Sequence, residues 1–282
     1  MPNRRWQLES EALGNNHLTH NNHFHPLWSV HEGEGPILAT ALQSGHEIRA
    51  DLAKILALEE DNRLREEDPF TDILTKAVAN RIVPIRSRFE VDLNRPREDA
   101  FYVEPDDAWG LQVWEQPPDQ KMIEKSLHEF DLFYAETKKR LCHLEAEYGR
   151  FVVFDIHSYN YRRRCPDAAP DDPAKNPDIN IGTGTMDRNK WENLVNHFIY
   201  DLRTFDYFGH HLDVRENVKF RGRQFASWVH TTFPDSGCVL SIELKKIFMD
   251  EWTGQLDRRK LDLLYNALKS TLPGILSELK RL

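Results

Sequence analysis

Short apolar blocks alternate with helical patterns along most of the chain. Pro36–Leu42 and Arg81–Arg86 are apolar runs of strand length, although Pro84 either weakens the second strand prediction or places that strand at a sheet edge. His46–Glu60 and Thr71–Ala79 carry apolar residues at the three- and four-residue spacing of helices. The first part of the chain therefore predicts two strands separated by two helices.

The clearest pattern lies in the middle of the chain. Residues 118–149 place their apolar side chains on one helical face, and Gly149 is a stop signal. Phe151–Ile156 follows as a run of β-branched and aromatic residues, which predicts a strand buried on both faces. The later segments are interpreted as two strands (Asp178–Gly182 and Cys238–Leu244), two helices (Arg188–Arg203 and Asp257–Leu282) and a proline-rich loop (Cys165–Asp178).

This order of elements predicts one α/β domain over residues 36–282, preceded by an N-terminal arm over residues 1–35. Strands that alternate with helices form a mostly parallel, mixed sheet between two helical layers, which is a three-layer α/β/α sandwich. The arm carries a histidine tract, consisting of His17, His20, His23 and His25.

Composition narrows the class of protein. The 282 residues include 37 Lys and Arg against 46 Asp and Glu, so the net charge is 37 − 46 = −9. An acidic chain lacks the basic surface on which general nucleic-acid binding depends, and no apolar run approaches the ~20 residues that span a bilayer. Three cysteines without a CxxC pair suit a reducing compartment. We therefore expect a cytoplasmic protein without a nucleic-acid or membrane partner.

Polar residues that follow the predicted strands are the first candidates for chemistry, because ligands of open α/β sheets bind beyond the carboxyl ends of the strands. His157 ends the central strand, and Asp155, two residues earlier, is expected on the same side, where it would orient the imidazole. His46 begins the helix after the first strand. The alternatives are a buried structural histidine at 157 and an exposed histidine at 46.

An acidic run, Glu66–Asp72, precedes the second helix. Asp followed by Pro is also typical of a helix N-terminus, so this run has a structural explanation. A hydrolytic zinc ion, however, commonly takes two imidazoles and one carboxylate and leaves a position open for water. Asp68 or Glu67 would supply that carboxylate beside His46 and His157.

A basic segment interrupts the acidic chain. Five arginines lie between Arg81 and Arg97, against only Glu90 and Asp92, which gives a local charge of +3. Arginine holds carboxylates through two parallel hydrogen bonds, so the segment predicts a small anionic substrate. The alternative is that these arginines pair with acidic residues elsewhere on the surface.

Glu243 is a carboxylate inside an otherwise apolar predicted strand. Such a group is costly unless it is paired or used, and burial would raise its pKa toward the range of a general base. The alternative is an ion pair with Lys245 or Lys246.

Three motifs, in this order, resemble the N-formylglutamate amidohydrolase family, a branch of the zinc carboxypeptidase-like hydrolases. They are Ser87-Arg88 with Asp92-Leu93-Asn94-Arg95-Pro96, then Asp155-Ile156-His157-Ser158, and then Asp178-Ile179-Asn180-Ile181-Gly182-Thr183. The resemblance extends from about Pro36 to Leu276. It implies a carboxypeptidase-like fold and a zinc-dependent enzyme that removes a formyl or other small acyl group from an acidic amino acid such as N-formyl-L-glutamate.

The resemblance also implies roles for single residues. His157 would ligate Zn²⁺, and Asn94 with Arg95 would hold the carboxylate of the substrate. Glu243 would be the catalytic carboxylate that takes a proton from water, and we assign Arg88 to the developing oxyanion.

One position departs from the family. The family typically carries Pro-His-Ser-Gly after its first strand, whereas Gln43 occupies the histidine position here. His46, three residues later, is then expected to ligate zinc together with Asp68 and His157. The alternatives are a peptidase or amidase that uses the same centre on a larger substrate, and a binding or regulatory protein that has lost catalysis at Gln43.

Overall fold

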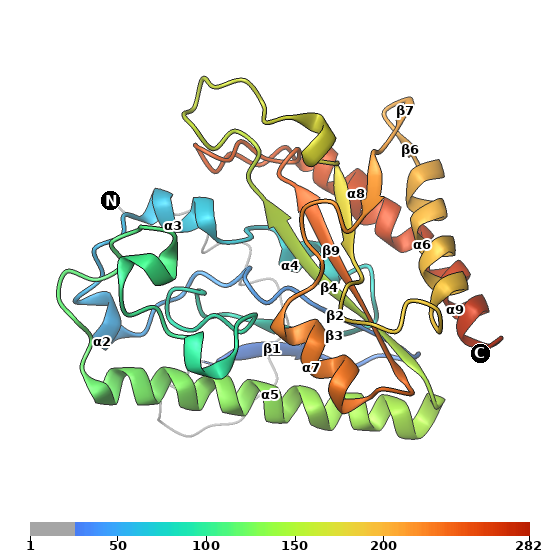
Figure 1. Cartoon of the computed structure of the whole chain (residues 1–282), viewed down its shortest axis with the longest axis horizontal. Coiled ribbons are helices and arrows are strands. Elements are labelled where there is room, and N and C mark those ends of the chain that lie inside the picture. The colour runs from blue at the N-terminus through green and yellow to red at the C-terminus, as the bar shows by residue number, and fades with distance from the viewer. Residues whose placement is uncertain (1–25) are drawn as a thin grey trace, which may run out of the picture.

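A seven-stranded mixed sheet forms the centre of the protein (Figure 1). The computed structural model describes residues 26–282, so the predicted histidine tract lies outside the described residues. The strand order is β1-β3-β2-β4-β9-β5-β8; β3, β2, β4 and β9 are mutually parallel, and β1 and β5 join them antiparallel. The strands are β1 (Trp28–His31), β2 (Ile37–Thr40), β3 (Asn80–Pro84), β4 (Phe151–Tyr159), β5 (Ile179–Gly182), β8 (Val214–Glu216) and β9 (Gly237–Lys245), with β6 (Asp206–Tyr207) and β7 (His210–His211) in a separate hairpin.

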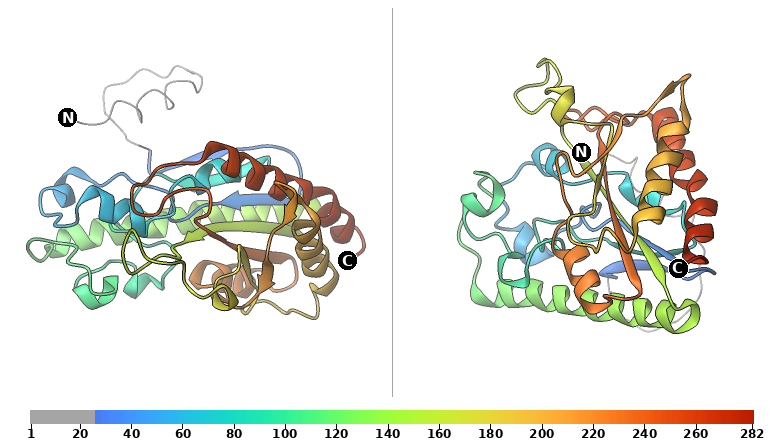
Figure 2. Two further views of the ribbon diagram at one scale, coloured as in Figure 1. Left: turned by 90° about the horizontal axis from the view of Figure 1, so that it is seen from above. Right: turned by 45° about the vertical axis from the view of Figure 1, so that its right-hand side comes forward.

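Helices cover both faces of this sheet. Helices α5 and α7 lie on one face of the sheet, and α4, α6, α8 and α9 lie on the other (Figure 2). The helices are α2 (Ala50–Ala53), α3 (Glu60–Glu66), α4 (Thr71–Thr75), α5 (Gln120–Tyr148), α6 (Glu192–Thr204), α7 (Gln224–Thr232), α8 (Arg258–Ser270) and α9 (Leu272–Leu279). The three-layer α/β fold predicted from the sequence is therefore confirmed.

Strand β4 shows how the sheet separates its two faces. Because side chains alternate along a strand, Val152, Phe154 and Ile156 pack in the core under α4, α6, α8 and α9. Phe151 and Val153 pack in the core under α5 and α7. All nine residues of β4 are buried, and the strand continues three residues beyond the Phe151–Ile156 run that predicted it. The same alternation places Asp155 and His157 on the α5 and α7 face.

A third apolar cluster lies beyond the carboxyl ends of β2 and β3. It gathers side chains from the long segment between α2 and α5 around Phe89, Tyr102 and Trp114, each at most 2% exposed. Leu52 of α2 is also fully buried there. This cluster fixes the loops that carry the arginine-rich segment, so those loops are part of the folded domain rather than a surface appendage.

Several boundaries differ from the sequence-based expectation. The helix expected over His46–Glu60 is reduced to the four residues of α2, and the terminal helix expected over Asp257–Leu282 breaks at Thr271, before Pro273. Strands β1 and β8 and helices α3 and α7 were not predicted. Strand β1 lies at the edge of the sheet and is mostly exposed, so it lacks the apolar run that marks the buried strands.

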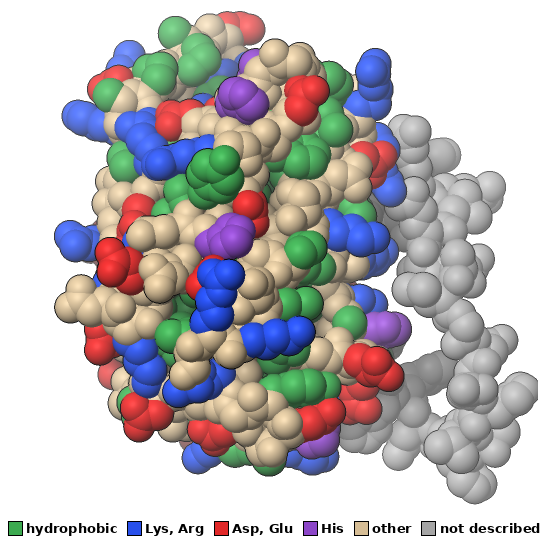
Figure 3. Space-filling view, turned by 90° about the vertical axis from the view of Figure 1, so that its right-hand side faces the viewer, with side chains coloured by type: hydrophobic (Ala, Val, Ile, Leu, Met, Phe, Trp, Pro, Cys, Tyr) green, Lys and Arg blue, Asp and Glu red, His purple; other side chains and the backbone are tan. Residues whose placement is uncertain are grey.

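The outer surface of the α6 and α9 layer carries Lys and Arg side chains interspersed with Asp and Glu (Figure 3). None of the helices in residues 26–282 is both long enough and apolar enough to cross a bilayer.

We expect Phe154→Ala to lower the free energy of unfolding by about 3–5 kcal/mol, because a buried phenylalanine loses both its transfer free energy and its packing. Phe154 is fully buried and lies 5.4 Å, centroid to centroid, from Phe198 of α6. Urea denaturation measures the change. The control is Tyr200→Ala, whose side chain lies on α6 and is 63% exposed, and which should change stability by less than about 0.5 kcal/mol. Equal losses for the two variants would contradict this account of the core.

Candidate active site

Polar side chains meet at the carboxyl ends of β4 and β9. In the parallel register of these strands, Asp155 lies opposite Ser241 and His157 lies opposite Glu243. All four residues are at least nine-tenths buried. Two carboxylates and an imidazole therefore lie side by side in the middle of the sheet, where burial without partners would be costly.

His157 lies between two carboxylates. Its Nδ1 is 3.1 Å from Asp68 Oδ2, and its Nε2 is 2.9 Å from Asp155 Oδ1 and 3.2 Å from Asn94 Nδ2. Burial alone would lower the pKa of His157, but Asp155 and Asp68 raise it well above its usual range. Both ring nitrogens have carboxylate neighbours, and the imidazolium form is favoured.

A buried lysine holds the loop that presents Asp68. Lys246 Nζ donates to the backbone carbonyls of Arg65 and Glu67, at 2.7 and 2.8 Å, and the Asp68 amide donates to the Gln43 carbonyl at 2.8 Å. Burial lowers the pKa of Lys246 to about 8. In the sequence, Lys246 was only a possible partner of Glu243, because no local pattern indicates that its side chain reaches this distant loop.

Glu243 is buried without a side-chain hydrogen bond among the described residues; its side chain is 7% exposed. The ion pair considered as an alternative is absent from this part of the chain, because Lys245 Nζ contacts Asp178 at 2.7 Å and Lys246 serves the loop carbonyls. Burial raises the pKa of Glu243 to about 7, with His157 and Arg223 opposing and Asp68 and Asp155 adding to the rise. A carboxylate in this state accepts a proton near neutral pH.

Asp92 is a buried hub for the arginine-rich segment. Its carboxylate accepts from Arg88 Nη2 at 2.7 Å, from Gln43 Nε2 at 2.7 Å and from the Tyr102 hydroxyl. The backbone amide of Asn94 also donates to it, at 3.0 Å. Burial would raise the pKa of Asp92, but Arg88 and these donors hold it at about 2. Tyr102 was missed, because a lone tyrosine in a loop carries no sequence signal for this role.

Most of the local +3 charge is neutralised by ion pairs and hydrogen bonds. Arg88 binds Asp92, Arg86 lies 3.5 Å from Glu47 and 3.7 Å from Glu90, and Arg97 binds the exposed Asp131. Arg81 donates to the Val78 carbonyl. Of these four arginines, only Arg86 and Arg97 pair with described acidic residues outside the segment, as the structural alternative expected.

Arg95 is the remaining arginine. Its nearest carboxylate, Asp92, is 3.7 Å from Nε, and its guanidinium lies over the Tyr102 ring at 4.5 Å and the Trp109 ring at 5.5 Å. Aromatic faces orient a guanidinium without using its hydrogen-bond donors. Arg95 is thus the arginine of this segment best placed to bind a carboxylate from outside.

Asn94 joins the histidine to helix α7. Its Nδ2 contacts His157 Nε2, and its Oδ1 accepts from the Phe225 backbone amide at 3.2 Å, in the first turn of α7. The amide oxygen is therefore engaged within the protein, whereas the amide nitrogen packs against a ring nitrogen that carries a proton in the imidazolium form. Its predicted role as a ligand of the substrate stays a prediction, and what the contacts show is a positioning residue.

Arg223 directly precedes α7 and was not found by the sequence analysis. It is exposed, its side chain makes no hydrogen bond or ion pair within residues 26–282, and its charge lowers the pKa of Glu243. The segment around it has no strand or helix pattern that would place it beside β9, so only the fold reveals it.

His46 does not join His157. Its Nδ1 lies 2.5 Å from Glu67 Oε2, and its Nε2 lies 2.9 Å from Arg63 Nη2. Glu67 also accepts from the Ser87 hydroxyl. This second cluster lies along the loop from Asp68, and it separates the two acidic residues that the sequence left as alternatives: Glu67 binds His46, and Asp68 binds His157.

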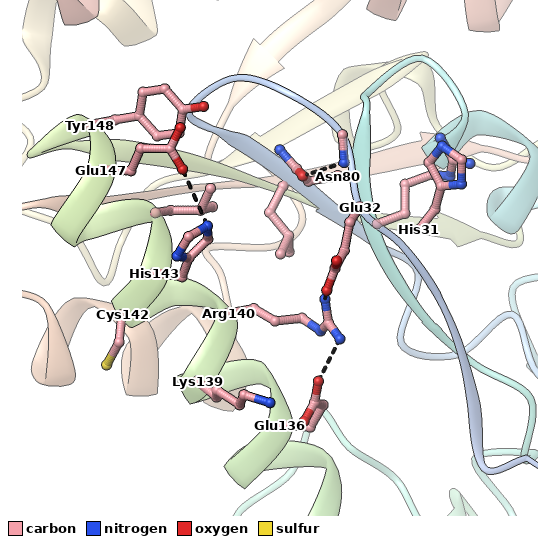
Figure 4. Close-up of a pocket in the computed structure, with 14 residues that line it drawn as sticks. His31, Glu32, Asn80, Glu136, Lys139, Arg140, Cys142, His143, Glu147 and Tyr148 are labelled. Carbon is pink, nitrogen blue, oxygen red and sulfur yellow. Dashed lines mark hydrogen bonds and ion pairs between the residues drawn. The ribbon is translucent and has the colours of Figure 1, made fainter.

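A cavity of about 810 Å³ lies elsewhere, between the second half of α5 and the β1 and β3 edge (Figure 4). Several of its charged side chains pair with one another: Arg140 bridges Glu32 and Glu136 at 2.8 and 2.5 Å, and His143 lies 3.2 Å from Glu147. None of the predicted site residues lines it.

Comparison with known proteins identifies the family of this chain. The family model described as N-formylglutamate amidohydrolase matches residues 35–249, which is more than half of the chain. The chain belongs to the N-formylglutamate amidohydrolase family. The matched segment contains Gln43, Asp92, His157 and Glu243.

Two solved structures share the fold of this family member. The N-formylglutamate amidohydrolase of Ralstonia eutropha JMP134 aligns over 90% of this chain and 98% of its own, with a TM-score of 0.71 and 16% identity. A gene product of Agrobacterium tumefaciens aligns over 89% and 96%, with a TM-score of 0.63 and 16% identity. The search of curated proteins gave no match. At this identity the two structures establish the fold.

The zinc centre that the resemblance implies is not assembled by the described residues of this family member. Residues 26–282 contain no group of three or more His, Cys, Asp or Glu side chains arranged to hold a metal. The expected set of His46, Asp68 and His157 fails because His46 turns to Glu67 and Arg63. Only Asp68 and His157 are neighbours. We therefore derive no catalytic step through a metal.

We expect Asp92→Asn to lower the free energy of unfolding by about 3–5 kcal/mol at pH 7, because Arg88 would stay buried without its counter-ion. The native pKa of about 2 lies below the ordinary value of 3.8, so the stabilisation by Asp92 is complete above that value and is lost as pH falls through about 2. Denaturation at pH 7 and at pH 2 should show a large and then a much smaller difference from wild type.

The matched control is Asp131→Asn, which removes the same charge from the exposed Arg97 pair and should cost less than about 1 kcal/mol. If Asp92→Asn lowers the free energy of unfolding no more than Asp131→Asn, or if its effect is as large at pH 2 as at pH 7, the stabilising role of Asp92 is contradicted.

Proposed function

We propose that this family member hydrolyses the amide bond of a small N-acyl amino acid that carries a carboxylate, with N-formyl-L-glutamate as the model substrate. The observation that carries the proposal is Glu243, a buried carboxylate without a hydrogen-bond partner among the described residues. Two arginines with weak or no ion pairs, Arg95 and Arg223, belong to the loops around it. Membership of the family supports the reaction class.

Glu243 is assigned the proton transfers. Its carboxylate takes a proton from a water molecule, and the water oxygen attacks the amide carbon. The C–N bond then breaks, and the proton passes from Glu243 to the leaving nitrogen, which gives formate and the free amino acid. A pKa of about 7 balances the ability to accept and to return this proton near neutral pH.

Roles are assigned to the arginines whose hydrogen-bond donors are not already used within the protein. Arg95, oriented by the Tyr102 and Trp109 rings, binds the carboxylate of the substrate. Arg223, next to the N-terminus of α7, stabilises the negative charge that develops on the carbonyl oxygen. This replaces the earlier assignment of Arg88, whose guanidinium already binds Asp92, Tyr102 and the Glu66 carbonyl.

One observation favours a second candidate function. Gln43 donates its amide to Asp92 at the position where the family carries histidine, so a protein that binds the same carboxylates without turnover is the competing hypothesis.

We expect wild-type protein to deformylate or deacylate at least one acidic member of a panel of N-formyl and N-acyl amino acids. Glu243→Gln should lower kcat by about 10²–10⁴-fold, because it removes the proton acceptor. The matched control is Glu278→Gln, which alters another buried glutamate, in α9, remote from β9, and should leave kcat unchanged. The assay follows release of the free amine. Binding of panel members without release of amine, with and without added zinc, would replace the hydrolase with the binding protein.

We expect Arg95→Ala to raise KM for acidic substrates by about 10- to 100-fold, the equivalent of the ~1.5–3 kcal/mol of a hydrogen bond to a charged group. The control is Arg97→Ala, two residues along the same loop, where the side chain already binds Asp131. Steady-state kinetics on acidic and neutral amides separates the two effects. An equal loss on neutral amides would argue against carboxylate binding by Arg95.

A further inference from the structure

We infer that this chain is one ligand short of a zinc site, and that the missing ligand is at position 43, so that the single change Gln43→His would create stoichiometric zinc binding. The inference concerns metal binding and is measured without turnover, so it stands or falls separately from the proposed hydrolysis.

The first part of the argument is the pair that does meet. His157 Nδ1 and Asp68 Oδ2 lie 3.1 Å apart, and both side chains are at least nine-tenths buried. An imidazole nitrogen and a carboxylate oxygen are zinc donors, but zinc sites in proteins use at least three protein ligands. Two donors leave such a site incomplete.

His46 is not available as the third donor. Arginine can only donate hydrogen bonds, so Arg63 Nη2 at 2.9 Å requires His46 Nε2 to be the acceptor, and Nδ1 must then donate to Glu67 at 2.5 Å. Both ring nitrogens are therefore committed in one tautomer. Ligation by His46 would leave Glu67 or Arg63, which are at most 8% exposed, without this partner.

We assign the third donor to position 43, because Gln43 is a neighbour of both Asp68 and Asp92. The Gln43 backbone carbonyl accepts from the Asp68 amide at 2.8 Å, so the two residues are direct neighbours across the loop. The Gln43 side-chain amide is 2.7 Å from Asp92 Oδ1 and donates to it. A glutamine in this role contributes a hydrogen bond to the Asp92 hub and supplies no imidazole to a metal.

Asp92 is positioned to accept a hydrogen bond from a histidine at position 43, as it now does from Gln43. A histidine that ligates a metal usually donates its other ring N–H to a carboxylate, which fixes its tautomer and orientation. Asp92 is such a carboxylate, already held in its charged form by Arg88. An imidazole at position 43 would keep the donation to Asp92 and direct its second nitrogen toward Asp68 and His157.

The test is the metal content of purified full-length protein after incubation with zinc and gel filtration. Wild type and Gln43→Ala should each retain less than about 0.1 zinc per chain, whereas Gln43→His should retain about one. Affinity should rise by more than about 100-fold over wild type, since even loss of an outer partner of a metal ligand costs ~10–100-fold. Replacement by cobalt should give the absorption bands of a four-coordinate site in Gln43→His alone.

The double change Gln43→His with His157→Ala should return the zinc content to the wild-type level, which ties the new metal to this centre. Stoichiometric zinc in wild type would overturn the inference, and this measurement decides the question even if Gln43→His does not fold. Zinc retention by Gln43→His no greater than by Gln43→Ala would overturn it as well.

Discussion

The burial of the Asp92 carboxylate is the constraint on which the site depends. A charged group in this position is stable only with several donors, and it takes them from Arg88, Tyr102, Gln43 and the Asn94 backbone amide. These donors come from the turn after β2, from the arginine-rich segment and from the loop that follows this segment. The charge of one residue therefore draws together segments that the sheet alone would leave independent.

Asn94 connects the contacts around Asp92 to the sheet. The side chain of Asn94 contacts His157 on β4 and accepts from the Phe225 amide at the start of α7. Helix α7 in turn packs in the same core as Val153 and Val239. The position of Arg223, immediately before α7, is thus set by the same network that fixes the imidazole, which explains how a surface arginine is held beside a buried glutamate.

Patterns of buried strands made part of this site predictable. The period of two along Phe151–Ile156 placed Asp155 and His157 on one side, and a carboxylate in an apolar run marked Glu243; the structure confirms both strands. The roles assigned to these residues stay predictions. Long-range contacts could not be predicted from the sequence. Lys246 donates to carbonyls 181 and 179 positions earlier in the chain. His46 contacts Glu67 through Nδ1 and Arg63 of α3 through Nε2.

Net charge did not distinguish the arginines from one another. The anionic substrate predicted from the +3 segment stays a prediction, and counting charges treated its arginines as equivalent. In the fold, burial separates them: Arg88 neutralises Asp92, which is itself inaccessible, while Arg95 keeps its donors because aromatic rings rather than carboxylates orient it. A guanidinium stacked on rings loses little hydration and no hydrogen-bonding capacity. Availability for a ligand is therefore decided by what each arginine packs against.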